Sequence, residues 1–87
     1  MTVKEAAELL LSRINRVRNV NNAFFGATDG TIGNINLLQK GMNQALGDWR
    51  EHKDTSGLQQ ITAQLHMYGN LTDQEYEQIM ETLDGEK

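Results

Sequence analysis

The sequence predicts an all-α fold, a compact bundle of four short helices arranged as two helical hairpins. Three observations support this prediction. The 87 residues include no proline, and a chain rich in Leu, Ala, Gln, Glu, Arg and Met without proline favours helix along most of its length. Apolar residues recur at steps of three and four, which places them on one face of a helix. Three segments begin with capping-box spacing, in which a Ser or Thr and a polar residue three positions later bind free amides at a helix start.

The first helix is expected over residues 2–25. Thr2 and Glu5 have capping-box spacing at its start. An apolar stripe follows with the steps of a heptad repeat. It consists of Val3, Ala7, Leu10, Ile14, Val17 and Phe24.

Two residues near the end of this helix are candidate contact residues. Asn21 interrupts the apolar stripe, and a buried Asn in such a seam commonly fixes the register of associating helices. The alternative is that the helix simply reaches the surface at Asn21. Phe24 and Phe25 are consecutive, so they cannot both face one interior; we expect Phe25 to cover the following loop or to make an exposed contact.

The second helix is expected over residues 34–53, after a loop at 26–33. That segment holds three glycines and an Asp-Gly pair, which favour turns, and Asn34 is expected to cap the helix. Gly41 and Ala45 form a small-residue edge that a neighbouring helix can approach closely. The apolar stripe consists of Ile35, Leu38, Met42, Ala45 and Trp49, with Leu37 and Leu46 flanking it. Trp49 is expected in the core, or alternatively as a binding hot spot beside Arg50.

The third helix is expected over residues 57–69. Ser56 and Gln59 have capping-box spacing at its start, and Gly69 followed by Asn70 is a stop signal. Its stripe consists of Leu58, Ile61, Leu65 and Tyr68.

The fourth helix is expected over residues 73–84. Thr72 and Glu75 form the clearest of the three capping boxes. The stripe of this helix consists of Tyr76, Ile79, Met80 and Leu83. Like the other large aromatic residues of the chain, Tyr76 is expected to lie mostly in the core.

Composition limits the class of protein. A chain of 87 residues has room for a single domain with a modest core. It has no cysteine, which excludes disulfides and thiolate metal sites and is typical of a reducing compartment. The longest purely apolar run, residues 9–11, is too short to span a membrane, and the first residues do not have the layout of a signal peptide. We therefore expect a cytoplasmic protein without a membrane partner.

Charge is divided unevenly along the chain. Residues 1–53 carry seven Lys or Arg against five Asp or Glu, whereas residues 54–87 carry one Lys against seven acids. Neither half is basic enough to be typical of a strong nucleic-acid-binding surface.

The one basic cluster lies on the first helix. Arg13 and Arg16 share a face of it, with Arg18 and Lys4 elsewhere on the same helix. Two interpretations stay open: contact with nucleic-acid phosphates, or charge pairing with the acidic fourth helix, within the chain or across a dimer. The pattern favours charge pairing, because no aromatic residues are interleaved with the arginines.

The acids of the fourth helix also have two interpretations. Glu75, Glu77 and Glu81 are expected on its solvent side. They form either a solvated face or a surface that recognises a basic partner.

The sequence predicts no catalytic residue, no cofactor-binding site and no metal-binding site. His52 and His66 have no other histidine three or four residues away, the spacing that commonly presents metal ligands on a helix. The glycines of the 26–33 loop lack the spacing and the following Lys of nucleotide-binding loops. The fourth-helix acids lack the paired, water-excluding setting that carboxylate catalysis needs. We therefore expect that the protein is not an enzyme.

Residues 57–84 resemble the short C-terminal domain family, called SHOCT. The resemblance rests on Leu58, Ile61 and Leu65, then Gly69, and then the run from Leu71 to Tyr76. An Asn between Gly69 and Leu71, and the absence of a lysine in the final helix, depart from the pattern of the family. The resemblance implies a helical hairpin with a role in interaction or oligomerisation.

Together these patterns predict a protein–protein interaction or oligomerisation module, such as a small accessory protein of a bacterium or phage, with a homodimer as one form. Two alternatives are a small inhibitor that presents its acidic face to a basic groove, and a nucleic-acid-associated regulator that uses the first-helix arginines. The candidate partner-binding residues are Arg13, Arg16, Asn21, Phe25, Trp49, Glu75, Glu77 and Glu81.

Overall fold

The fold is all-α, as the sequence predicts. The computed structural model describes the backbone of residues 1–24 and 30–85 and the side chains of residues 1–17 and 36–85. Its helices are α1 (Val3–Phe24), α2 (Gly30–His52), α3 (Ser56–Met67) and α4 (Asp73–Asp84). No strand occurs in this part of the chain.

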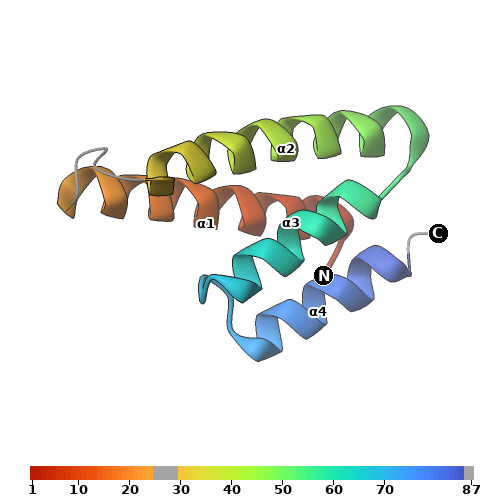
Figure 1. Cartoon of the computed structure of the whole chain (residues 1–87). Helices are drawn as coiled ribbons and strands as arrows, with labels where there is room; N and C mark the ends of the chain where they lie inside the picture. The colour runs from red at the N-terminus through yellow and green to blue at the C-terminus, as the bar shows by residue number, and fades with distance from the viewer. Residues whose placement is uncertain (25–29, 86–87) are drawn as a thin grey trace.

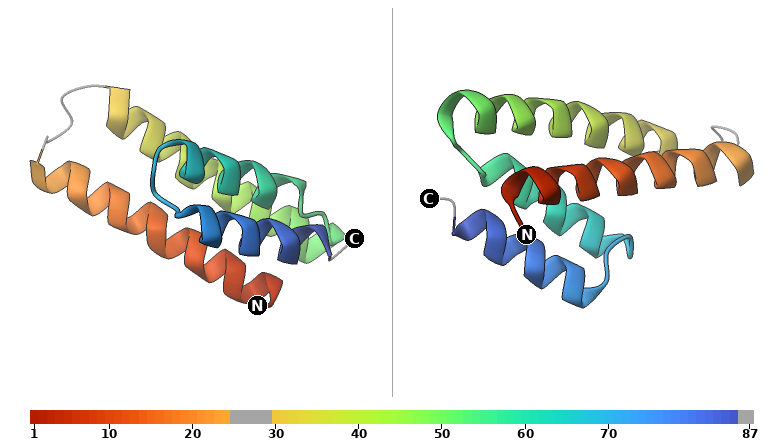
Figure 2. Two further views of the ribbon diagram at one scale, coloured as in Figure 1. Left: turned by 90° about the horizontal axis from the view of Figure 1, so that it is seen from below. Right: turned by 180° about the vertical axis from the view of Figure 1, so that it is seen from behind.

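The helices form the two predicted hairpins, of unequal length. α1 and α2 make a long hairpin, and the shorter hairpin of α3 and α4 packs across one half of it (Figure 1). The end of α1 and the start of α2 project beyond the turn between α3 and α4, as both views in Figure 2 also show. The core therefore lies where the two hairpins overlap.

One hydrophobic core joins all four helices. The apolar stripes predicted from the sequence supply most of it, since their period matches the helical repeat. The buried apolar residues are Val3, Ala6, Ala7, Leu10, Ile14, Leu38, Met42, Ala45, Leu58, Ile61, Leu65, Leu71, Ile79 and Leu83. Leu9, Leu11, Leu46 and Trp49 are partly buried against them.

The closest approach of two helices lies between α2 and α3. A Cβ atom built on Gly57 would lie 2.8 Å from the Cβ of Ala45 and 3.1 Å from its Cα, so only glycine fits at this crossing. The predicted close approach therefore involves Ala45, with Gly57 opposite it. At Gly41 an added Cβ would lie 3.4 Å from Cδ1 of Ile61, at the edge of ordinary contact.

Two of the three predicted capping boxes are present. At the start of α1, the Thr2 amide donates to Glu5 Oε1 at 2.9 Å and the Glu5 amide donates to Thr2 Oγ1 at 3.1 Å. At the start of α4, the Thr72 amide donates to Glu75 Oε1 at 3.0 Å and the Glu75 amide donates to Thr72 Oγ1 at 3.1 Å. Each pair satisfies amides that a helix start leaves free.

The capping box predicted at Ser56 was wrong. α3 begins at Ser56 itself, after Thr55, whose side chain makes no capping hydrogen bond. Instead, Asp54 Oδ1 accepts hydrogen bonds from the amide and the hydroxyl of Ser56, at 3.0 and 2.7 Å. The buried hydroxyl of Thr55 donates to the backbone oxygen of Leu83 at 3.1 Å, so it links the start of α3 to the end of α4.

The loop predicted at 26–33 was too long, because α2 already begins at Gly30. A glycine inside a helix costs about 1 kcal/mol relative to Ala, but unlike proline it removes no backbone donor. The first turns of α2 can therefore remain helical. Asn34 consequently lies within the helix, and its prediction as the capping residue was also wrong.

α3 ends at Met67, in a motif built around a left-handed glycine. Gly69 has φ of +78°, which glycine adopts without steric cost. The amide of Gly69 donates to the His66 oxygen at 3.0 Å and that of Asn70 to the Leu65 oxygen at 2.8 Å, the two bonds of a Schellman motif. Tyr68 follows the last helical residue and is 61% exposed, so its prediction as a core residue was wrong.

Candidate functional site

Arg13 and Glu75 form an ion pair between α1 and the start of α4. Arg13 Nη1 and Nη2 donate to Glu75 Oε1 and Oε2 at 2.9 and 2.6 Å, the paired geometry that guanidinium and carboxylate groups favour. Arg13 Nη1 also donates to the backbone oxygen of Asn70 at 3.0 Å. A single arginine therefore fixes α1 to both ends of the α3–α4 turn.

This environment shifts the ionisation of Glu75. The hydrogen bonds from Arg13, and next the one from the Thr72 amide, lower the pKa of Glu75 from 4.5 to about 2. Both contacts favour the carboxylate form. Glu75 is thus at once a helix-capping residue and one half of an ion pair.

The pair changes the interpretation of the predicted partner-binding residues. The side chains of Arg13 and Glu75 are only 19% and 25% exposed and contact each other, so the charges of both are already compensated. The structure brings these two predicted residues together within the chain. Arg16 remains exposed on α1.

The solvent-facing side of α4 carries fewer of the predicted acidic residues than the sequence alone indicated. Glu77 and Glu81 are exposed, as predicted for a solvent-facing side. Glu75 was predicted to share that side, but its capping position turns it toward Arg13.

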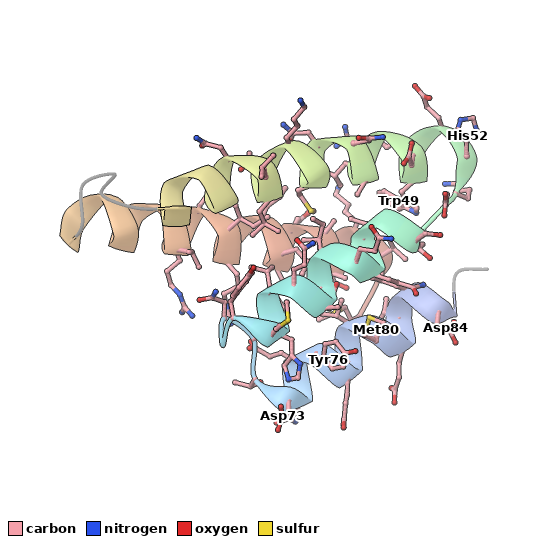
Figure 3. The ribbon with its side chains drawn as sticks, viewed as in Figure 1. Trp49, His52, Asp73, Tyr76, Met80 and Asp84 are labelled. Atoms are coloured by element: carbon pink, nitrogen blue, oxygen red, sulfur yellow. The ribbon has the colours of Figure 1, made fainter. Side chains whose placement is uncertain are left out.

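An aromatic cluster closes the α3–α4 hairpin. His66 Nε2 lies 2.7 Å from Asp73 Oδ1, and the His66 ring stacks on Tyr76 with centroids 4.2 Å apart and planes 17° apart. Figure 3 shows Asp73 at the start of α4 and Tyr76 one turn further along it. The contacts join residues seven and ten positions apart, and they hold the two helices of the hairpin together.

Trp49 lies near the end of α2, partly buried against the core (Figure 3). Its indole Nε1 is buried and has no hydrogen-bond partner in the part of the chain that the structure describes. Lys53 Nζ lies 5.5 Å from the ring centroid, within the range of a cation–π contact. Trp49 therefore contacts both the core and Lys53, and its role as a partner-binding residue stays a prediction. The side chain of Asn21, and Phe25 altogether, lie outside the described residues.

A concave groove lies between α2 and α3. It has a volume of about 690 Å³. Ala45 of α2 lies against Gly57 of α3, and Figure 1 shows that the two helices diverge away from the connection between them. Leu37 of α2 and Tyr68 after α3 line its walls, together with Val17 of α1. We call this feature the α2–α3 groove.

The α2–α3 groove combines exposed apolar side chains with neutral amides. Leu37 is 68% exposed and Tyr68 is 61% exposed. Gln44, Gln60 and Gln64 provide hydrogen-bonding groups along the walls, and Asp48 provides a carboxylate. The walls of the groove therefore present both apolar surface and hydrogen-bonding groups to the solvent.

Sequence reasoning missed Leu37 and Tyr68 as surface residues. Leu37 has a detectable signal: with Gly41, Gln44 and Asp48 it forms a second stripe of α2, at steps of four, three and four. Only Leu37 is strongly apolar in that stripe, so a search for apolar periodicity does not find it. The prediction that Tyr68 is buried assumed that the third helix continues to residue 69. Because α3 ends at Met67, Tyr68 lies beyond the helix.

The described part of the chain contains neither a helix that could span a membrane nor a metal-binding cluster. None of its helices is long and apolar enough to cross a membrane. No group of three or more His, Asp or Glu side chains among them is arranged to hold a metal ion.

Comparison with protein-family models, with curated proteins and with solved structures yielded no match for this chain. The SHOCT resemblance of residues 57–84 therefore stays a prediction.

Proposed function

We propose that the protein is a non-enzymatic interaction module that binds another polypeptide in the α2–α3 groove. The observation that carries this proposal is the exposure of Leu37 and Tyr68 on the two walls of one groove. Burying large apolar side chains drives association, by about 25 cal/mol for each Å² removed from water. A helical segment with an apolar stripe fits a groove between two helices.

The two alternative functions receive less support. Phosphate binding by the first-helix arginines would have to break the contact of Arg13 with Glu75 and Asn70. Recognition of a basic groove by α4 would rest on Glu77 and Glu81, without the charge of Glu75, which Arg13 compensates. In each alternative, the residue expected to make the central contact, Arg13 or Glu75, already forms an ion pair within the chain.

Site-specific photo-crosslinking tests the proposed function. A photoreactive amino acid replaces Gln64, an exposed residue of the groove wall, in cells that naturally carry the chain. The matched control carries it at Gln78, an exposed residue of α4. We expect a discrete covalent adduct with a protein from position 64 and not from position 78, and its loss when Leu37→Glu is added. Equal labelling from both positions, or none from position 64, contradicts the proposal.

A further inference from the structure

Among the described residues that line the α2–α3 groove, Asp48 is the only charged one. Lys40 and Arg50, the Lys and Arg residues of α2, do not line it. α3 supplies no charge from Asp, Glu, Lys or Arg, since its sequence contains none of them. The groove therefore presents a single negative charge among apolar and amide groups.

The carboxylate of Asp48 has no partner in the part of the chain that the structure describes. Asp48 is half-buried, and none of the ion pairs and side-chain hydrogen bonds of that part uses its carboxylate. A half-buried charge attracts an opposite charge more strongly than a charge in bulk water does, because the effective dielectric constant around it is lower. A cation brought into the groove would therefore find an uncompensated carboxylate.

The charge of the whole chain favours the same kind of partner. The 87 residues carry a net charge of −4 at pH 7, and residues 54–87 hold one Lys against seven acids. A negatively charged chain attracts a cationic polypeptide during diffusion and repels an acidic one. The local charge at Asp48 and the net charge of the chain therefore agree in sign.

Both walls of the groove have the residue spacing of a surface that binds a helix. Each wall carries a stripe at steps of four, three and four: Leu37, Gly41, Gln44 and Asp48 on the α2 side, and Gly57, Ile61, Gln64 and Tyr68 on the α3 side. Such steps place each stripe on one side of its helix, so a third helix can contact both stripes along its length. At Gly41 the α2 wall has no side chain, which lets the backbone of an occupant come close.

The apolar and the charged parts of the groove lie at opposite ends. Leu37 precedes Asp48 by eleven residues, which is about 16 Å along the helix axis at 1.5 Å for each residue. Gly57 lies against Ala45 and Ile61 lies near Gly41, so α2 and α3 run antiparallel and Tyr68 lies toward the Leu37 end. A helix that uses both ends needs an apolar residue and a cation about eleven positions apart, which three turns place on the same face.

We propose that the occupant of the α2–α3 groove is a cationic amphipathic helix of another protein. An apolar side chain of this helix lies between Leu37 and Tyr68, and a Lys or Arg about eleven positions away pairs with Asp48. Gln44 and Gln64 offer hydrogen bonds to the polar residues between these two anchors. The proposal rests on the proposed function, because it names the class of partner for the same groove.

Selection of peptides by the purified full chain tests the charge preference of the groove. The probes are a displayed library of helical peptides of about 18 residues, randomised on one face. We expect enrichment of peptides that carry a large apolar residue and a Lys or Arg about eleven positions apart. The same selection with Asp48→Lys should enrich Asp or Glu at the position of the cation. Enrichment of the same cationic peptides by both chains, or no enrichment by the unaltered chain, overturns the proposal.

Fluorescence anisotropy of one selected peptide measures the size of the effect. Asp48→Lys should weaken its binding about tenfold or more, and a peptide with Glu in place of the cation should regain most of that affinity for the Asp48→Lys chain. Glu8→Lys makes the same change of net charge at an exposed position of α1 and should change the affinity by about twofold or less. Circular dichroism checks that each variant is as helical as the unaltered chain. An equal loss in Asp48→Lys and Glu8→Lys contradicts a specific pair at Asp48.

The two proposals fail in different ways. A protein that crosslinks from position 64 in cells, with an adduct that Asp48→Lys leaves unchanged, keeps the interaction function standing and refutes the cationic helix. Sedimentation tests the other occupant: a dimer of the unaltered chain that Leu37→Glu dissociates would make the occupant a second copy and overturn the helix of another protein. Absence of any adduct from position 64 contradicts the proposed function itself.

Discussion

Glu75 shows how one residue can have both a local and a long-range role. Within α4 its carboxylate accepts the Thr72 amide and completes the capping box, and across the bundle it binds the Arg13 guanidinium. The exposed acid Glu77, two residues further along, has neither contact among the described residues. Glu75 and Glu77 are the same type of residue. Their roles differ because Glu75 lies at the third position of α4, where its carboxylate reaches the free amide of Thr72.

Replacing Glu75 with Gln should destabilise the protein by about 1–3 kcal/mol at neutral pH, because hydrogen bonds to a charged group are the stronger ones. Glutamine still suits a capping box, so the loss reports mainly on the contact with Arg13. Urea unfolding measures the change. The matched variant Glu77→Gln should stay within about 0.5 kcal/mol of the unaltered chain, and an equal loss in both variants would contradict the assigned role.

The pH dependence of this difference has a definite sign. The pKa of Glu75 falls from 4.5 to about 2 in the folded protein, so the unfolded chain binds the proton more tightly. The stability that Glu75 contributes is therefore complete above about pH 4.5 and is lost as the pH falls toward 2. The gap in unfolding free energy between the unaltered chain and Glu75→Gln should narrow over that range. A gap that stays constant would exclude the ionised pair as its origin.

At the scale of the elements, two helical glycines differ in what surrounds them. Gly57, in the first turn of α3, faces Ala45 too closely for a Cβ atom, whereas a Cβ atom on Gly47 in α2 would meet nothing within 4 Å. Helix propensity favours alanine at both positions. Of these two positions, only Gly57 has a packing contact that excludes alanine despite its higher helix propensity.

Alanine substitutions should therefore act in opposite directions. Gly57→Ala should destabilise the chain by about 1–3 kcal/mol, since α2 and α3 must move apart to admit the methyl group. Gly47→Ala should stabilise it by about 0.5–1 kcal/mol through helix propensity. Thermal and urea unfolding of the two variants provide the measurement, and a stabilising Gly57→Ala would show that the crossing is looser than the structure has it.

The sequence predicted those elements whose signal is local. The capping residues Thr2 and Thr72 lie three positions from their partners, and the stripes repeat within one helix, so both can be recognised without knowledge of the fold. Thr55 could not be interpreted in this way, because its hydroxyl binds the Leu83 oxygen, 28 residues away. The partnership of Arg13 with Glu75 was one of several interpretations left open, since their separation of 62 residues leaves no mark in the spacing.

The α2–α3 groove was less predictable than the core. Its shape results from the angle between two helices, which is set where Ala45 meets Gly57. Its strongly exposed apolar residues are Leu37, which lies outside the main stripe of α2, and Tyr68, which lies beyond the end of α3. A concave surface of this kind depends on how elements are placed, whereas a core can be inferred from each element alone.

At the scale of the whole molecule, the unequal hairpins leave a small core. Domains of this length bury only about 60–65% of the surface of the unfolded chain, which makes them marginally stable alone. A polypeptide bound in the α2–α3 groove would stabilise the fold by mass action, because it would bind the folded chain and not the unfolded one. Stability and function would then be linked through one surface.

The groove residue Leu37 should consequently contribute to binding and not to the fold. Leu37→Glu should leave the free energy of unfolding of the purified chain within about 0.5 kcal/mol of the unaltered value, because the side chain is 68% exposed and lies outside the core. Gln78→Glu adds the same charge to the exposed face of α4 and should change the stability as little. Urea unfolding of the three chains provides the measurement. A loss of about 2 kcal/mol or more in Leu37→Glu alone would mean that Leu37 supports the fold, and the groove would then lose an exposed apolar contact on its α2 wall.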